Sequence, residues 1–158
     1  MRKVIVNTTP IIALAGIGQL ELLRKLYSEI WIPEAVKKEI LSEPARTQVS
    51  MAEWIIVHTI SGGIQKSAFS SRLHAGEIEV IILAQESDAD LVIVDDNAAK
   101  KTAKYFGFPV TGTLGVLLKA KKQGLIDNVR SYIDKLMDNG LYISPVVRNY
   151  VLEQADEM

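Results

Sequence analysis

The 158-residue chain has no cysteine and only two histidines. Without cysteine it can form neither disulfides nor zinc–thiolate sites, and thiolate catalysis is excluded. The two histidines, His58 and His74, are too few for a histidine-rich metal centre. A net charge of −1 means that any nucleic-acid binding must come from a local basic patch rather than from the molecule as a whole.

The chain also lacks an apolar run long enough to span a membrane. An apolar stretch that follows Arg2 and Lys3 imitates a signal peptide, but the polar residues at 7–10 interrupt it. We therefore expect a cytoplasmic protein with no membrane segment, which the absence of cysteine also fits. The hydrophobic fraction of 48% and the length together predict one folded domain over residues 1–158.

Segments typical of strands and helices alternate along the chain. Strands are expected at 3–7, 29–32, 55–59, 91–95 and 109–111. Helices are expected at 10–16 (with Thr9 as N-cap), 20–27, 33–41, 47–53, 77–86, 98–106, 114–122, 127–138 and 145–155. Residues 61–75 are rich in glycine and serine and predict a loop. The alternation predicts a three-layer α/β fold with a mainly parallel central sheet flanked by helices.

Two of the expected strands run directly into polar residues. Leu91–Val94 is a continuous apolar run, typical of a strand buried on both faces, and Asp95 and Asp96 follow it. The run Val4-Ile5-Val6 likewise ends at Asn7. Parallel sheets bind ligands beyond the carboxyl ends of their strands, so we expect these side chains to border a site.

Two glutamates add to this set. Glu39 lies at the edge of the buried face of the expected helix 33–41, and Glu77 follows Gly76 at a helix start. Two carboxylates about 5 Å apart repel by roughly 3 kcal/mol at an effective dielectric near 20. A cluster therefore implies a bound cation, a shifted pKa or a fold other than the expected one. Oxygen-only ligands suit Mg²⁺ or Mn²⁺, which can activate water for in-line phosphoryl displacement.

Each of these residues also has a purely structural interpretation. Glu77 can stabilise the positive end of its helix dipole, and Glu39 can be a solvated helix charge. The pair after the strand at 91–95 can cap the following helix, and an asparagine at a strand end is often a turn former. Only their shared placement at strand exits and helix edges favours a common site.

A basic stripe begins next to the two aspartates. Asn97, Lys100, Lys101 and Lys104 share one helix face, and such a face could hold a phosphate backbone or be merely solvated. Thr111 and Thr113 follow another short strand and could donate hydroxyls to a phosphate, although Thr113 can equally cap the next helix. No aromatic stacking platform of the kind found in single-strand binders is evident.

Several short motifs, in order, resemble those of PIN-domain proteins of the compact prokaryotic branch that includes toxins of toxin–antitoxin pairs. The matching segments are Val4-Ile5-Val6-Asn7-Thr8-Thr9-Pro10-Ile11-Ile12-Ala13-Leu14, Ile32-Pro33-Glu34-Ala35-Val36 with Glu39, Gly76-Glu77-Ile78-Glu79, Leu91 to Asp96, and Thr111-Gly112-Thr113-Leu114-Gly115. The resemblance covers nearly the whole chain. It implies a PIN fold and a metal-dependent ribonuclease site built from an acidic quartet.

Carried over residue by residue, the quartet is Asn7, Glu39, Glu77 and Asp95, with Asp96 as the alternative to Asp95. The family usually has aspartate at the first position, and the amide of Asn7 supplies no negative charge, so the resemblance implies weakened metal binding. It also implies RNA as substrate, a small antitoxin protein as partner and a homodimer.

The leading hypothesis is therefore a Mg²⁺- or Mn²⁺-dependent endoribonuclease. The second is a catalytically degenerate PIN-like module that binds RNA or protein, which the uncharged Asn7 favours. A third is a phosphoacceptor switch, because receiver domains also have a strand that ends in two aspartates. In those domains the pair follows the first strand, whereas here it comes past the middle of the chain.

Overall fold

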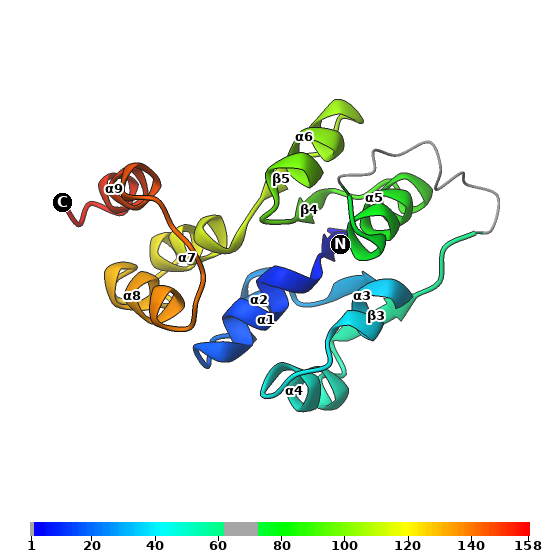
Figure 1. Ribbon diagram of the computed structural model, residues 1–158, viewed down its shortest axis with the longest axis horizontal. Coiled ribbons are helices and arrows are strands. Elements are labelled where there is room, and N and C mark those ends of the chain that lie inside the picture. The colour runs from blue at the N-terminus through cyan, green and yellow to red at the C-terminus, as the bar shows by residue number, and fades with distance from the viewer. Residues whose placement is uncertain (1, 62–72) are drawn as a thin grey trace.

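The computed structural model describes residues 2–61 and 73–158 of the chain (Figure 1). In this part of the chain one sheet is formed, and all of its strand pairs are parallel. Its strands are β1 (Val4–Val6), β2 (Ile30–Pro33), β3 (Ile55–His58), β4 (Leu91–Ile93) and β5 (Val110–Thr111). Helices flank the sheet, which confirms the predicted three-layer α/β fold.

The central strands are the most apolar ones. Val4, Ile5 and Val6 of β1 are fully buried, as are Val92 and Ile93 of β4. Strands covered on both faces need apolar side chains on both, which explains why these runs do not alternate with polar residues. The two-residue strand β5 lies at one edge of the sheet and is only half-buried.

The helices of the described chain connect the strands and then extend beyond the sheet. They are α1 (Thr8–Gly16), α2 (Glu21–Tyr27), α3 (Glu34–Glu39), α4 (Ala45–Met51), α5 (Ala75–Ser87), α6 (Asn97–Tyr105), α7 (Thr113–Lys122), α8 (Arg130–Asp138) and α9 (Pro145–Gln154). The helix α5 packs on β1, β2 and β4, whereas α2 packs on β2 and α7. Figure 1 shows α7, α8 and α9 together at the end of the molecule that also holds the C-terminus. None of the helices in the described ranges is long and apolar enough to cross a bilayer.

Some predicted helix boundaries are wrong. The helix α1 begins at Thr8 rather than after a Thr9 cap, because Asn7 keeps the extended backbone of the strand and the helix follows directly. Pro10 then lies in the first turn, where its missing N–H costs no hydrogen bond. The helix α4 covers Ala45–Met51 rather than 47–53. Most of the predicted loop at 61–75 lies outside the described residues, and α5 already begins at Ala75.

The strand order β3-β2-β1-β4-β5 fixes where a ligand can bind. From β1 the chain adds β2 and β3 on one side, and it then crosses to add β4 and β5 on the other. Right-handed crossovers in opposite directions place their helices on opposite faces of the sheet. A crevice therefore opens between the carboxyl ends of β1 and β4, where ligands of open α/β sheets bind.

Candidate active site

The expected polar residues emerge at this crevice. The strands β1 and β4 pair with Val6 opposite Ile93, and the Asn7 backbone N–H donates to the Ile93 carbonyl over 2.9 Å. Asn7 therefore leaves β1 beside the point where Val94, Asp95 and Asp96 leave β4. Glu39 is the last residue of α3, and Glu77 is in the first turn of α5, which packs against α3.

Asn7, Glu39 and Glu77 line one hollow of about 270 Å³, together with Thr8, Thr9 and His74. We call it the acidic hollow. The Thr8 hydroxyl donates to Glu39 Oε1 over 2.6 Å, and the Gly76 N–H donates to Glu39 Oε2 over 3.1 Å. A Cβ atom at Gly76 would overlap Glu39 Oε1, so glycine is what lets this carboxylate reach the start of α5.

Glu77 is the most perturbed acid of the hollow. Its side chain is only 6% exposed, and the His74 N–H donates to its Oε1 over 2.9 Å. Burial raises the pKa of Glu77 above its ordinary value, and the negative charges of Asp96 and Glu39 raise this pKa further. The hydrogen bond from the His74 backbone and the charge of the His74 ring act in the opposite direction. A bound cation would offset both the cost of burying this negative charge and the repulsion by the neighbouring acids.

Asn7 contributes an unsatisfied oxygen. The residue is 4% exposed, and within the described chain its buried side-chain Oδ1 has no hydrogen-bond partner. The side chain does not cap α1, although Asn7 occupies the N-cap position. An unpaired buried acceptor costs roughly 1–3 kcal/mol of desolvation free energy. A ligand that accepts a lone pair of this oxygen would offset that cost.

Asp95 lies on the other side of the crevice, and each of its side-chain oxygens accepts a hydrogen bond. The Thr113 N–H donates to Asp95 Oδ1, and the Thr113 hydroxyl donates to Asp95 Oδ2, both over 2.7 Å. The aspartate lines a second cavity of about 340 Å³, whose lining also includes Lys100, Tyr142 and Val147. We call it the Asp95 cavity. The alternative use of Thr113 as a helix cap is not what the structure has, because Gly112 occupies the N-cap position of α7.

The neighbouring Asp96 has a different role. It is the N-cap of α6, and its Oδ2 accepts the Ala99 N–H over 3.0 Å. The capping interpretation therefore holds for Asp96, whereas Asp95 is bound by the start of α7. Asp96 still acts on the acidic hollow, because its charge raises the pKa of Glu77.

The predicted quartet is thus divided between two cavities. Asn7, Glu39 and Glu77 share the acidic hollow, and Asp95 lines the other cavity. Within residues 2–61 and 73–158, no three acids or histidines stand close enough to one another to chelate an ion without rearrangement. The donors are nonetheless all oxygens, one of them buried and unpaired, and this set fits a hard cation such as Mg²⁺ or Mn²⁺.

The residues predicted to bind nucleic acid differ in how close they lie to the site. Lys100 lines the Asp95 cavity, whereas Lys101 and Lys104 are exposed along α6. Thr113 is 1% exposed and donates its hydroxyl proton to Asp95, so in this arrangement it orients an acid. Thr111 is half-buried, and its Oγ1 fills the space beside Gly115.

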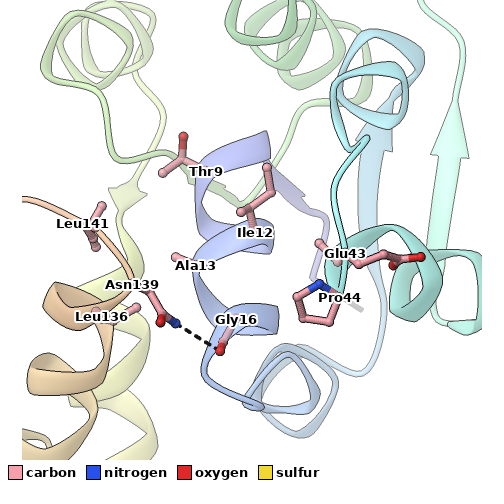
Figure 2. A pocket seen from close by; sticks show the side chains of 11 residues that line it. Thr9, Ile12, Ala13, Gly16, Glu43, Pro44, Leu136, Asn139 and Leu141 are labelled. Carbon is pink, nitrogen blue, oxygen red and sulfur yellow. Dashed lines mark hydrogen bonds between the residues drawn. The ribbon is translucent and has the colours of Figure 1, made fainter.

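A larger groove of about 480 Å³ adjoins both cavities (Figure 2). It shares Thr9 with the acidic hollow and Leu141 with the Asp95 cavity. Figure 2 shows α1 between the Pro44 side and the Asn139 side of this groove, where the Asn139 side-chain amide donates to the Gly16 carbonyl over 3.1 Å. Its lining is mainly apolar and includes one acid, Glu43.

Two site residues were not found by sequence reasoning. Thr8 fixes Glu39, and its position directly after Asn7 was the only available signal. Tyr142 borders the Asp95 cavity from the segment between α8 and α9, and no local pattern relates it to Asp95.

Comparison with protein families gives one match. A family model described as PIN domain matches residues 3–157 of the chain. A search of curated proteins found no match.

Proposed function

The chain belongs to the PIN-domain family, and we propose that it is a divalent-metal-dependent endoribonuclease. PIN domains form a nuclease family whose members generally depend on divalent metal ions and bind RNA. The observation that carries the proposal is the gathering of Asn7, Glu39 and Glu77 at the crevice between β1 and β4, beside Asp95. The chain has no cysteine, so a thiolate nucleophile is excluded. The acids instead favour hydrolysis of a phosphodiester by metal-activated water.

The residues would divide the work between the two cavities. Glu39, Glu77 and Asn7 would hold Mg²⁺ or Mn²⁺ from the acidic hollow, and Asp95 or Asp96 would complete the ligand set. When bound, the ion lowers the pKa of water and stabilises the charge that develops on the phosphate. Thr113 keeps the Asp95 carboxylate in one orientation through both of its oxygens. Lys100, with Lys101 and Lys104 along α6, would bind the phosphate backbone.

Cleavage of a single-stranded RNA in Mn²⁺ tests the proposal. We expect Glu77→Gln and Asp95→Asn each to lower the cleavage rate about 100-fold, in line with the loss of a metal-site residue. The matched controls are Glu53→Gln and Asp127→Asn, which change the same chemical groups at exposed positions away from the site. Chelation of the metal should abolish cleavage by the wild type. Equal cleavage by all five proteins would overturn the assignment of the site.

A second candidate function follows from Asn7. Its amide supplies an oxygen but no charge, so the set Asn7, Glu39, Glu77 and Asp95 has one carboxylate fewer than a full acidic quartet. On this alternative the protein is a degenerate PIN-like module that binds RNA or protein. Binding of RNA in the presence of chelator, with no cleavage under Mg²⁺ or Mn²⁺, would favour it.

We further propose that the protein is the toxin of a toxin–antitoxin pair, acts in the cytoplasm, and forms a homodimer that binds a small antitoxin. The support is the resemblance of its ordered motifs to the compact prokaryotic PIN proteins. Light scattering on the purified protein tests the dimer. Growth arrest on expression of the wild type, absent with Glu77→Gln, tests toxicity, and equal growth with both would contradict it.

A further inference from the structure

The Asp95 cavity is lined by both polar and apolar residues. Lys100 and Asn97 are among the polar ones, and Tyr142 and Val147 are an aromatic and an aliphatic residue of the same lining. Its volume of about 340 Å³ lies within the range of small-ligand sites. A ligand that matches this lining has an anionic part and a flat apolar part.

Tyr142 is an exposed tyrosine next to a core residue. It is 83% exposed, whereas the next residue, Ile143, is 5% exposed and belongs to the core. The Leu141 N–H donates to the Leu136 carbonyl, and the Ser144 hydroxyl accepts the Val147 N–H at the start of α9. The backbone on both sides of Tyr142 is therefore anchored, so the ring can receive a partner without the entropic cost of ordering a loop.

Lys100 supplies the matching charge. A Cβ added at Gly112 would lie 2.6 Å from Asp95 Oδ1 and 3.2 Å from Lys100 Nζ, so the ammonium group lies near the aspartate. A phosphate there would be adjacent to the acidic crevice. A base attached to it would extend toward Tyr142 and Val147.

We propose that the Asp95 cavity holds the nucleotide next to the cleaved phosphodiester, with its base stacked on Tyr142 and its phosphate at Lys100. The inference rests on the proposed ribonuclease function and adds a positioning residue to it. Stacking on a tyrosine accepts any base, so Tyr142 favours single-stranded over paired RNA rather than one sequence over another.

Binding of a labelled single-stranded RNA, measured in chelator at low salt, tests the proposal independently of cleavage. Because the base would lose its stacking partner, Tyr142→Ala should weaken binding about 10-fold, whereas Tyr142→Phe keeps the ring and should bind like the wild type. The matched control is Tyr105→Ala at the far end of α6, where the tyrosine is 84% exposed. Binding of duplex RNA should be the same for all four proteins.

An RNA of the same length in which every nucleotide is abasic gives the sharper readout. The wild type should bind this RNA about 10-fold more weakly than the normal RNA, whereas Tyr142→Ala should bind the two about equally. In Mn²⁺, cleavage by Tyr142→Ala should show a raised KM.

The result that overturns the inference is unchanged binding by Tyr142→Ala, an equal loss with Tyr105→Ala, or no RNA binding by the wild type. Wild-type protein that binds RNA through Tyr142 but never cleaves it would instead refute the ribonuclease proposal alone. An unchanged thermal melt of Tyr142→Ala would show that the exposed ring does not support the fold.

Discussion

The acidic hollow and the Asp95 cavity lie at neighbouring strand ends, yet their side chains are in opposite states. In the hollow, Asn7 Oδ1 has no partner within the described chain and the pKa of Glu77 is raised. In the cavity, both oxygens of Asp95 accept hydrogen bonds from Thr113. A bound cation would therefore stabilise the hollow most, because it would pair with the free oxygen and the buried charge there. The Asp95 carboxylate, in contrast, is already held by hydrogen bonds within the fold.

Substitutions at the two glycines beside the acids should have the largest effect. Gly112→Ala would place a Cβ 2.6 Å from Asp95 Oδ1, which Thr113 holds in place, so we expect a loss of about 2–3 kcal/mol in the free energy of unfolding. Gly76→Ala meets the end of the exposed Glu39 side chain, which can move away, and alanine favours the helix. We therefore expect almost no loss of stability there. Urea denaturation measures both, and equal losses would show that the two acids are equally rigid.

Replacing Asn7 by aspartate should lower the stability of the hollow without metal and raise its affinity for metal. A buried carboxylate beside Glu39 and Glu77 should cost about 2 kcal/mol of stability in chelator, because its charge is unpaired. The same charge should tighten Mn²⁺ binding at least about tenfold, since it adds a charged ligand. Calorimetric titration and thermal melts with and without Mn²⁺ measure these effects. Unchanged or weaker affinity in Asn7→Asp would indicate that Asn7 does not face a metal site.

The smallest expected effect concerns Glu77 and pH. Because burial raises the pKa of Glu77 in the folded protein above its ordinary value of 4.5, the folded state holds this proton more tightly than the unfolded state. Ionisation of the Glu77 side chain therefore lowers the free energy of unfolding. This loss is complete above the raised pKa of the folded state and absent below the pKa of the unfolded state. In chelator, Glu77→Gln should melt a few degrees higher than the wild type at pH 8, while its oxygen still accepts the His74 N–H.

The difference in melting temperature should shrink as the pH falls toward 4. Asp127→Asn, at an exposed position, is the control for a lost surface charge. A melting difference that is independent of pH, or a less stable Glu77→Gln at pH 8, would contradict the buried-charge interpretation.

The sequence predicted the sheet well because its central strands are continuous apolar runs, and it placed Asn7 and Asp95 correctly at the carboxyl edge. It could not separate Asp95 from Asp96, because both follow the same strand. Their roles depend on which helix start each one meets, that of α6 for Asp96 and that of α7 for Asp95. Tyr142 was missed for a related reason, since only the packing of α8 and α9 brings its segment to the crevice.

The bond between Thr113 and Asp95 also has a consequence for biosynthesis. The polar groups at the crevice come from positions 7, 39, 77 and 95, and the group that holds the last of them arrives only at position 113. A nascent chain on the ribosome therefore lacks an oriented Asp95 until residues well past the middle of the protein have emerged. Premature termination before that point yields fragments without an assembled centre.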